Sequence, residues 1–146
     1  SVSRVGGRAQ LPAYQAVVSD LRLSYAQFLE LEVFSRFATQ LDEQTQRALV
    51  RGRRVREVLK QRAGHPLPPA EQVAVLLAVT GGLFDDLSVE AVPTAETRIR
   101  RAVREDLPDL CRRIEAGRRL SQEDRGRLLE VARAAIAALP TDGGGA

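Results

Sequence analysis

Apolar side chains recur every three or four residues through the first quarter of the chain, which is the spacing of one face of an α-helix. These positions are Tyr14, Val17, Val18, Leu21, Tyr25, Phe28, Leu29, Leu31, Phe34 and Phe37. Pro12 stands just ahead of them, where a missing backbone N–H does not weaken a helix. The pattern predicts one long or slightly broken helix over about residues 12–38.

A second amphipathic segment begins near Asp42, whose side chain is of a type that caps helix N-termini. Its apolar face is expected to comprise Leu49, Val55, Val58 and Leu59. A cluster of glycine and proline then predicts the end of regular structure. The cluster consists of Gly64, Pro66, Pro68 and Pro69.

The most apolar stretch of the chain runs from about Ala70 to Thr80 and leaves almost no polar face. A helix that is apolar all round is expected to be buried at the centre of a fold. The Gly81-Gly82 pair suits its C-terminus. Residues 84–87 are expected to form a turn, and Ser88 to cap the next segment.

The last third of the chain predicts shorter helices. Pro93 is expected to interrupt a short segment, so that a helix covers about residues 94–106. Pro108 begins another short helix, which ends at Gly117.

The final helix is indicated by Ser121 and Asp124, which have the spacing of a capping box. It is predicted to run to about Leu139, followed by a disordered tail over 140–146. Because the pattern is helical throughout, the fold class predicted is all-α, a multi-helix bundle.

Composition agrees with a helical core and excludes several classes of function. Of the 146 residues 44% are hydrophobic but only 4% aromatic, so leucine, valine and alanine must fill the core. Cys111 and His65 are each the sole residue of their type, which excludes a disulfide framework and the usual metal or triad spacings. Cys111 is expected to be buried filler. No apolar run approaches the roughly 20 residues needed to span a bilayer.

The opening residues SVSRVGGRAQ fit neither a helix nor a core strand. Arg4 lies between small residues, close to Gly6 and Gly7, whose backbone freedom could let an arginine be pointed across a gap. The segment is interpreted as coming from within a longer protein.

Many short motifs in one gapless register resemble the alpha subunit of F-type ATP synthases, at the junction between its nucleotide-binding and C-terminal domains. The resemblance runs from Ser1 to about Asp86 and fades beyond about Val92, which fits a divergent or alternate-operon branch. It rests on SVSRVGG with Gln10, Leu21-Arg22-Leu23, Ala26-Gln27-Phe28, Glu30-Leu31, Phe34 to Phe37, Leu41-Asp42, Arg51-Gly52, Glu57, Leu59-Lys60-Gln61 and Glu71 to Val75.

The resemblance implies a division of the chain and a set of partners. Residues 1–11 would be the remnant of the nucleotide-binding domain and hinge, and residues 12–139 the C-terminal helical domain. Such a subunit forms a ring with beta subunits around the central stalk gamma subunit. The parent complex makes or hydrolyses ATP coupled to proton or sodium transport, at the cytoplasmic face of the bacterial inner membrane. It contacts the membrane only indirectly.

The resemblance also implies roles for two residues at nucleotide sites. Arg4 matches the arginine that reaches into the catalytic site of the adjacent beta subunit, and a guanidinium suits the charge that builds up in phosphoryl transfer. Gln61 matches a glutamine of the adenine pocket in the subunit's own non-catalytic site. Ala63 stands where the family has a second glutamine, so only its backbone could contact adenine.

Asp85 and Asp86 occupy a turn that, by the resemblance, hangs at the bottom of the domain and faces the central stalk. Two carboxylates beside a basic shaft would give a weak, slippery contact. An ordinary solvated turn accounts for these residues equally well.

No phosphate loop of the GxxxxGK[ST] type occurs in the sequence. The fragment alone is therefore not expected to be an enzyme or to bind a cofactor, whereas the full-length subunit would bind ATP or ADP with magnesium.

The alternative function is an arginine-rich helical module that binds nucleic acid. Two basic clusters raise it: Arg51, Arg53, Arg54 and Arg56, then Arg98, Arg100, Arg101 and Arg104. Acidic residues are interspersed, and the net charge is only +3. A solvated helix face is the better interpretation, and no nucleic-acid partner is expected.

Overall fold

The computed structural model describes residues 11–37, 40–62, 67–137 and 139, with only the backbone at residues 61 and 62. This part of the chain forms six α-helices and one short 3₁₀ helix, and it contains no β-strand. The all-α prediction is confirmed. None of these helices is both long enough and apolar enough to cross a membrane.

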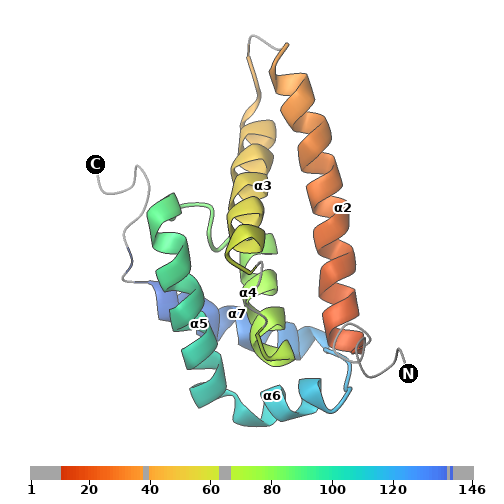
Figure 1. The fold of residues 1–146 in the computed structure, drawn as a ribbon, viewed down its shortest axis with the longest axis vertical. Coiled ribbons are helices and arrows are strands. Elements are labelled where there is room, and N and C mark those ends of the chain that lie inside the picture. Colours follow the sequence, from red (N-terminus) through yellow and green to blue (C-terminus); the bar gives the residue numbers. More distant parts are fainter. Residues whose placement is uncertain (1–10, 38–39, 63–66, 138, 140–146) are drawn as a thin grey trace.

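Helices α2 (Pro12–Ser35) and α3 (Glu43–Arg62) form a long antiparallel hairpin (Figure 1). Pro12 occupies the first turn of α2, as predicted, and the helix ends three residues before the expected position 38. The N-cap prediction for Asp42 is also confirmed, because Oδ1 of Asp42 accepts a 2.7 Å hydrogen bond from the Thr45 N–H. Hydrogen bonds with Thr45 lower the pKa of Asp42.

The two arms of the hairpin touch where Phe28 of α2 meets Gly52 of α3. A Cβ atom at position 52 would lie only 2.0 Å from Cδ1 of the Phe28 ring. Phe28 is 2% exposed, and its ring lies 5.5 Å from that of Tyr25. Only glycine permits this close approach of the two helices.

The far half of α2 departs from the predicted pattern. Leu29, Phe34 and Phe37, expected on the buried face, are 43%, 58% and 83% exposed, and Leu59 of α3 is 39% exposed. The predicted helical period was correct. Near the hairpin tip, however, no other part of the described chain covers the apolar face of α2, so its side chains stay exposed. Leu23 and Val33 add to this exposed apolar surface.

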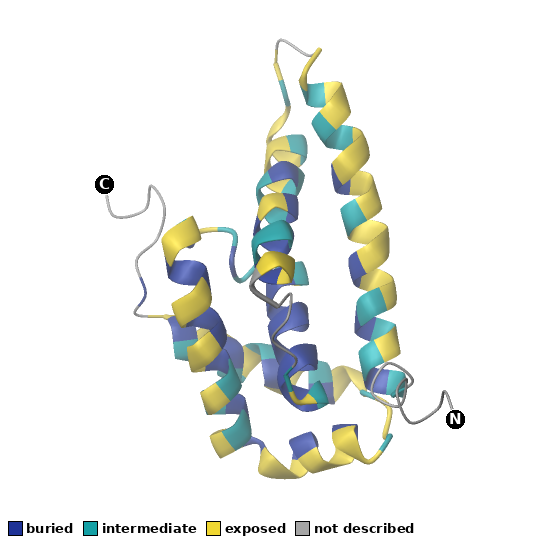
Figure 2. Cartoon of the chain, viewed as in Figure 1, coloured by how far each residue is buried: buried dark blue, intermediate teal, exposed yellow. Residues whose placement is uncertain are grey.

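Helix α4 (Pro69–Thr80) is the centre of the fold, as predicted. Every residue from Ala70 to Val79 is buried (Figure 2). Pro69 begins this helix instead of ending regular structure, because proline fits the first helical turn. The glycine pair closes it: Gly82 has φ of +89°, and the N–H groups of Gly82 and Leu83 donate to the carbonyls of Val79 and Ala78.

The turn after α4 leads through η1 (Val89–Ala91) into α5 (Val92–Asp106). Ser88 precedes η1, but its side chain makes no capping hydrogen bond, so that prediction was wrong. Pro93 lies in the first turn of α5 and does not interrupt it, again because the missing N–H is harmless there.

Two further helices complete the chain, α6 (Pro108–Glu115) and α7 (Gln122–Ile136). The helix that begins at Pro108 closes at Gly117, which has φ of +97°. The capping box is present: the Ser121 hydroxyl accepts from the Asp124 N–H at 3.0 Å, and Asp124 accepts from the Ser121 N–H at 3.1 Å. Helix α7 ends three residues before the expected Leu139.

The helices surround α4, which packs against all five of the others. The α2–α3 hairpin stands on one side and α5 on the other, while α7 and, below it, α6 run across the lower part of the view in Figure 1. The start of α2 lies at the opposite end of the molecule from the hairpin tip.

Candidate functional site

The residues expected at nucleotide sites lie mostly outside the described ranges. Arg4, Ala63 and His65 fall in segments that the structure does not describe. Gln61 belongs to the last turn of α3, but only its backbone is described. The roles assigned to Arg4 and Gln61 stay predictions.

The turn with Asp85 and Asp86 is held against the middle of α3. The guanidinium of Arg51 donates to Asp85 Oδ2 at 3.0 Å, whereas Asp86 is exposed. Both aspartates line a cavity of about 330 Å³ next to the start of α3. The hairpin tip extends beyond this turn along the long axis of the molecule (Figure 1). The stalk contact expected for Asp85 and Asp86 stays a prediction.

Three arginines of α3, Arg51, Arg54 and Arg56, hold other elements in place. Arg54 is 6% exposed, and its Nε donates to the Leu87 carbonyl at 3.0 Å. Arg56 donates to the Tyr25 hydroxyl at 3.2 Å and to Glu32 at 3.1 Å. Hydrogen bonds to Tyr25 and then Glu32 raise its pKa, so it stays charged. The expected solvated face was wrong for these arginines and for Arg51, because their partners lie far away in the sequence, in α2 and in the turn that follows α4.

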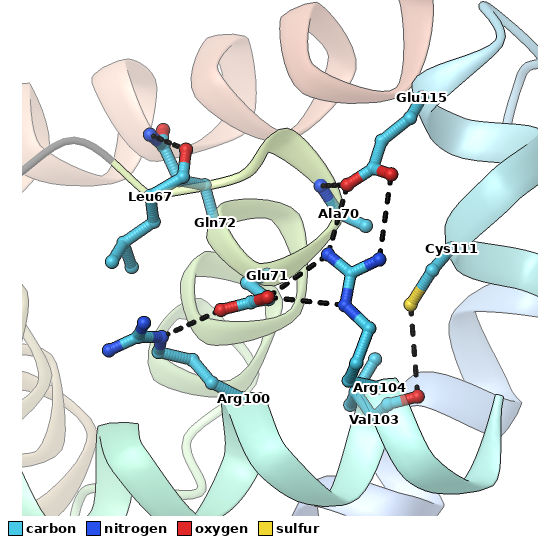
Figure 3. A network of polar contacts seen from close by, with 9 residues as sticks. All are labelled: Leu67, Ala70, Glu71, Gln72, Arg100, Val103, Arg104, Cys111 and Glu115. Atoms are coloured by element: carbon cyan, nitrogen blue, oxygen red, sulfur yellow. Dashed lines mark hydrogen bonds and ion pairs between the residues drawn. The ribbon is translucent and has the colours of Figure 1, made fainter. Parts of the chain in front are cut away.

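The best-defined polar cluster joins α4, α5 and α6 (Figure 3). Glu71 of α4, with its side chain only 12% exposed, accepts from Arg100 Nε at 2.8 Å. It also accepts from Arg104, at 3.2 Å from Nε and 3.0 Å from a terminal nitrogen. Two guanidiniums thus offset one nearly buried carboxylate, which would otherwise be costly to bury.

Arg104 extends the cluster to α6. Its terminal nitrogen lies 3.0 Å from Oε2 of Glu115, and the same carboxylate oxygen accepts the Ala70 N–H at 3.4 Å. The hydrogen bond to Glu115 and that to Glu71 raise the pKa of Arg104 against the opposing effect of burial. We name Glu71, Arg100, Arg104 and Glu115 the Glu71 cluster.

Cys111 lies beside this cluster but is not part of it. Its thiol is buried and faces the Val103 carbonyl at 3.7 Å. Burial raises the pKa of Cys111, which keeps the thiol protonated and unreactive near neutral pH. The expectation of buried filler is confirmed.

The described residues contain no group of three or more His, Cys, Asp or Glu side chains placed to hold a metal. The cluster is a set of neutralised ion pairs between helices, which suits holding and positioning better than bond-breaking chemistry.

Comparison with known sequences decides what kind of domain this is. A sequence model of the ATP synthase alpha/beta chain, C terminal domain, matches residues 10–135. The chain belongs to this family.

Relatives named as ATP synthase alpha subunits align with nearly all of this chain. Subunit alpha 2 of Syntrophus aciditrophicus is 59% identical over 140 residues, or 96% of this chain and 27% of that protein. Subunit alpha 1 of Rhodopirellula baltica is 48% identical over 136 residues, or 93% and 27%. Subunit alpha 1 of a Marinomonas species is 46% identical over 142 residues, or 97% and 28%. The chain spans about a quarter of the length of these relatives.

Family membership confirms the resemblance seen in the sequence, but the Glu71 cluster was missed. Two signals could have indicated it. Glu71 is a charge inside an almost wholly apolar helix, and such a charge needs a partner. Arg100 and Arg104 are four residues apart and so share one face of α5.

Proposed function

We propose that this chain is the C-terminal helical domain of an ATP synthase alpha subunit, placed in a ring of alpha and beta subunits around a central stalk gamma subunit. The observation that carries the proposal is the family match over residues 10–135, together with relatives named as alpha subunits. The full-length subunit would bind ATP or ADP with magnesium. The assembly would couple ATP synthesis or hydrolysis to proton or sodium transport, as a peripheral head at the cytoplasmic face of the bacterial inner membrane.

The exposed apolar residues of α2 support membership of a larger assembly. Leu23, Val33 and Phe34 of α2, and Phe37 in the turn just after it, are each more than half exposed. Apolar surface gathered in this way marks a contact with another protein. In the proposed assembly, neighbouring subunits would cover it.

Arg4 is proposed to act in the catalytic site of the adjacent beta subunit. Residues 1–11 would belong to the end of the nucleotide-binding domain and the hinge, because α2 begins only at Pro12. A guanidinium supplied from a neighbour stabilises the charge that forms on the transferred phosphoryl group. Motion of the C-terminal domain about the hinge in residues 1–11 would change the position of Arg4.

Gln61 and Asp86 are proposed to contact nucleotide and stalk, respectively. Gln61 ends α3, and its amide can both donate to and accept from an adenine edge. Asp85 is tied to Arg51, so Asp86 is the more exposed carboxylate of the turn. Nucleic-acid binding is disfavoured, because Arg51, Arg54, Arg56, Arg100 and Arg104 have partners within the fold.

The experiment is to replace Arg4 in the assembled complex and measure steady-state ATP hydrolysis. Arg4→Ala should lower the rate on the order of 10³- to 10⁵-fold, with nucleotide binding largely kept. Arg4→Lys should not restore it, because lysine lacks the planar fork of donors. Arg8→Ala is the matched control, expected to keep the normal rate. An Arg4→Ala complex with a rate within threefold of the unmodified complex would refute the proposed role.

A further inference from the structure

Helix α2 carries a second apolar face, on the side turned away from the rest of the fold. Leu21 and Phe28 are buried, and Leu23 and Glu30 each follow one of them by two residues. Two residues turn an α-helix by about 200°, so Leu23 and Glu30 point away from the buried side. Exposed residues accordingly follow α2 along its length in Figure 2. This second face is open to a partner.

Residues on this face are spaced as in a seam between two packed helices. They stand alternately three and four residues apart, which keeps them in one stripe along the helix. The stripe, named here the α2 seam, consists of Leu23, Ala26, Glu30, Val33 and, in the turn just after α2, Phe37. All five are exposed, and Phe34 beside them is 58% exposed. A stripe of this shape fits another helix.

Glu30 is the charged member of the α2 seam. Its neighbours three and four residues away on the helix are Ala26, Gln27, Val33 and Phe34, none of which is basic. Within the described ranges no hydrogen bond or ion pair joins Glu30 to another residue. A purely apolar cover would take water from this carboxylate and give it no partner, which is costly. A partner that covers the seam therefore has to bring an arginine or a lysine to Glu30.

Arg22 and Arg36 flank the α2 seam. Each immediately precedes a seam residue, Leu23 or Phe37, so both lie on the same flank. They are 14 residues apart, or about 21 Å along the helix, with Glu30 between them. Both are exposed, and neither has an ion-pair partner in the part of the chain that the structure describes. The complementary helix would be acidic near both ends of the contact and basic near its middle.

A second copy of this chain does not supply that pattern. Glu30 is the midpoint of the α2 seam, seven residues from both Leu23 and Phe37. In a two-fold symmetric pair centred on the seam, whether parallel or antiparallel, Glu30 of one copy would face Glu30 of the other. Two carboxylates brought together and removed from water repel each other. The charges therefore favour a different chain.

We propose that the α2 seam is a docking surface for a helix of a different subunit, whose contacting face is apolar and carries an arginine or lysine that pairs with Glu30. The inference rests on the membership of a larger assembly proposed above, and it adds the chemistry of one contact. A stripe about 21 Å long and 10 Å wide covers roughly 200 Å², well short of the about 800 Å² per partner of a stable interface. The contact therefore forms together with others in the assembled complex.

The first test identifies the partner by cross-linking in the purified complex that contains the full-length subunit. Photoreactive p-benzoylphenylalanine is introduced in place of Leu23 or Phe37, and the adducts are mapped by mass spectrometry. Both probes should react with one helix of a different subunit, at positions on the order of 14 residues apart. An arginine or lysine of that helix should lie between the two positions. The same probe in place of Glu130, exposed on α7, is the matched control and should not react with that helix.

The second test reverses the charge of Glu30. Glu30→Lys should weaken binding of the subunit to the rest of the complex on the order of 30-fold or more, because two like charges would face each other. The Tm of the unassembled full-length subunit should change by no more than about 2 °C, because Glu30 is exposed and unpaired within the described residues. Changing the cross-linked basic residue to glutamate should restore binding. Glu130→Lys is the control and should leave binding unchanged.

Each other outcome overturns the inference. Adducts with a second copy of the same subunit, with a loop, or with a helix that has no basic residue between the two positions would exclude the proposed partner. Absence of adducts would show that the α2 seam faces solvent. If Glu30→Lys and Glu130→Lys had the same effect on binding, the ion pair would be refuted. In all these cases the assembly itself stands, whereas a full-length subunit that joins no complex would refute the proposed function as well.

Discussion

The contact between Gly52 and Phe28 makes a sharp prediction for the α2–α3 hairpin. An alanine Cβ at position 52 would lie 2.0 and 2.1 Å from two ring carbons of Phe28, and 2.7 Å from its Cβ. Ordinary carbon–carbon contacts are about 3.5–4.0 Å, so the shortest one falls short by about 1.5 Å. The ring cannot simply rotate away, because the Phe28 Cβ is also too close. The two helices must separate.

The expected size follows from two opposing effects. Overpacking a well-filled site costs about 1–3 kcal/mol, and the involvement of the Phe28 Cβ puts Gly52→Ala near the upper end. Alanine favours a helix interior over glycine by about 1 kcal/mol. The net loss in the free energy of unfolding is therefore about 2 kcal/mol, or about 8 °C in Tm for a domain of this size.

The assay is thermal and urea denaturation of the 146-residue chain, followed by circular dichroism at 222 nm. Gly126→Ala is the matched control, because Gly126 also lies inside a helix but has no atom within 4 Å of its would-be Cβ. That change should stabilise the chain by about 0.5–1 kcal/mol. If Gly52→Ala proved as stable as Gly126→Ala, the close helix crossing would be refuted.

Two further predictions concern the capping box of α7. Ser121→Ala should lower the free energy of unfolding by about 0.5–2 kcal/mol in the same denaturation assay, because it removes the acceptor for the Asp124 N–H. An unchanged midpoint would show that the cap contributes nothing. Burial alone would raise the pKa of Asp124, but hydrogen bonds from Ser121 and the charge of Arg113 outweigh it and leave the pKa lowered. The stability that Asp124 contributes is thus complete above about pH 4 and is lost as the pH falls through the lowered value. Asp124→Asn should therefore be less stable than the unmodified chain at pH 6, and the difference in Tm should shrink between about pH 4 and pH 2; a constant difference would contradict the lowered pKa.

Features encoded by neighbouring residues could be predicted from the sequence. Asp42 caps α3 and Ser121 caps α7 because the groups that each side chain satisfies lie within three residues of it. The glycine pair after α4 closes that helix for the same local reason. Proline was harder to interpret, because it can either end a helix or occupy the first turn of one. Pro69 and Pro93 lie in first turns, where breaks in regular structure were expected.

Features that depend on distant residues could not be predicted in the same way. The burial of an apolar residue in and after α2 depends on whether α3 or α4 lies beside it. Phe34 and Phe37 lie beyond the reach of α4, so they are exposed although burial was expected. The partners of Arg51 and Arg104 lie 34 and 33 residues away in the sequence, in Asp85 and Glu71. The candidate roles of Arg4 and Gln61 at nucleotide sites came from the family resemblance. They stay predictions, because the structure describes neither side chain.

The central position of α4 has a consequence for the order in which the chain can fold during synthesis. Its ten buried residues need α7 as one of their walls, yet Ile136, the last residue of α7, is made 56 residues after Thr80. At about 5–20 residues per second, that interval is roughly 3–11 s. For those seconds the most apolar helix of the chain has only α2 and α3 beside it at first, and later α5 and α6. During this interval the apolar surface of α4 is exposed to aggregation, and the α2–α3 hairpin, which is made before α4, covers part of it.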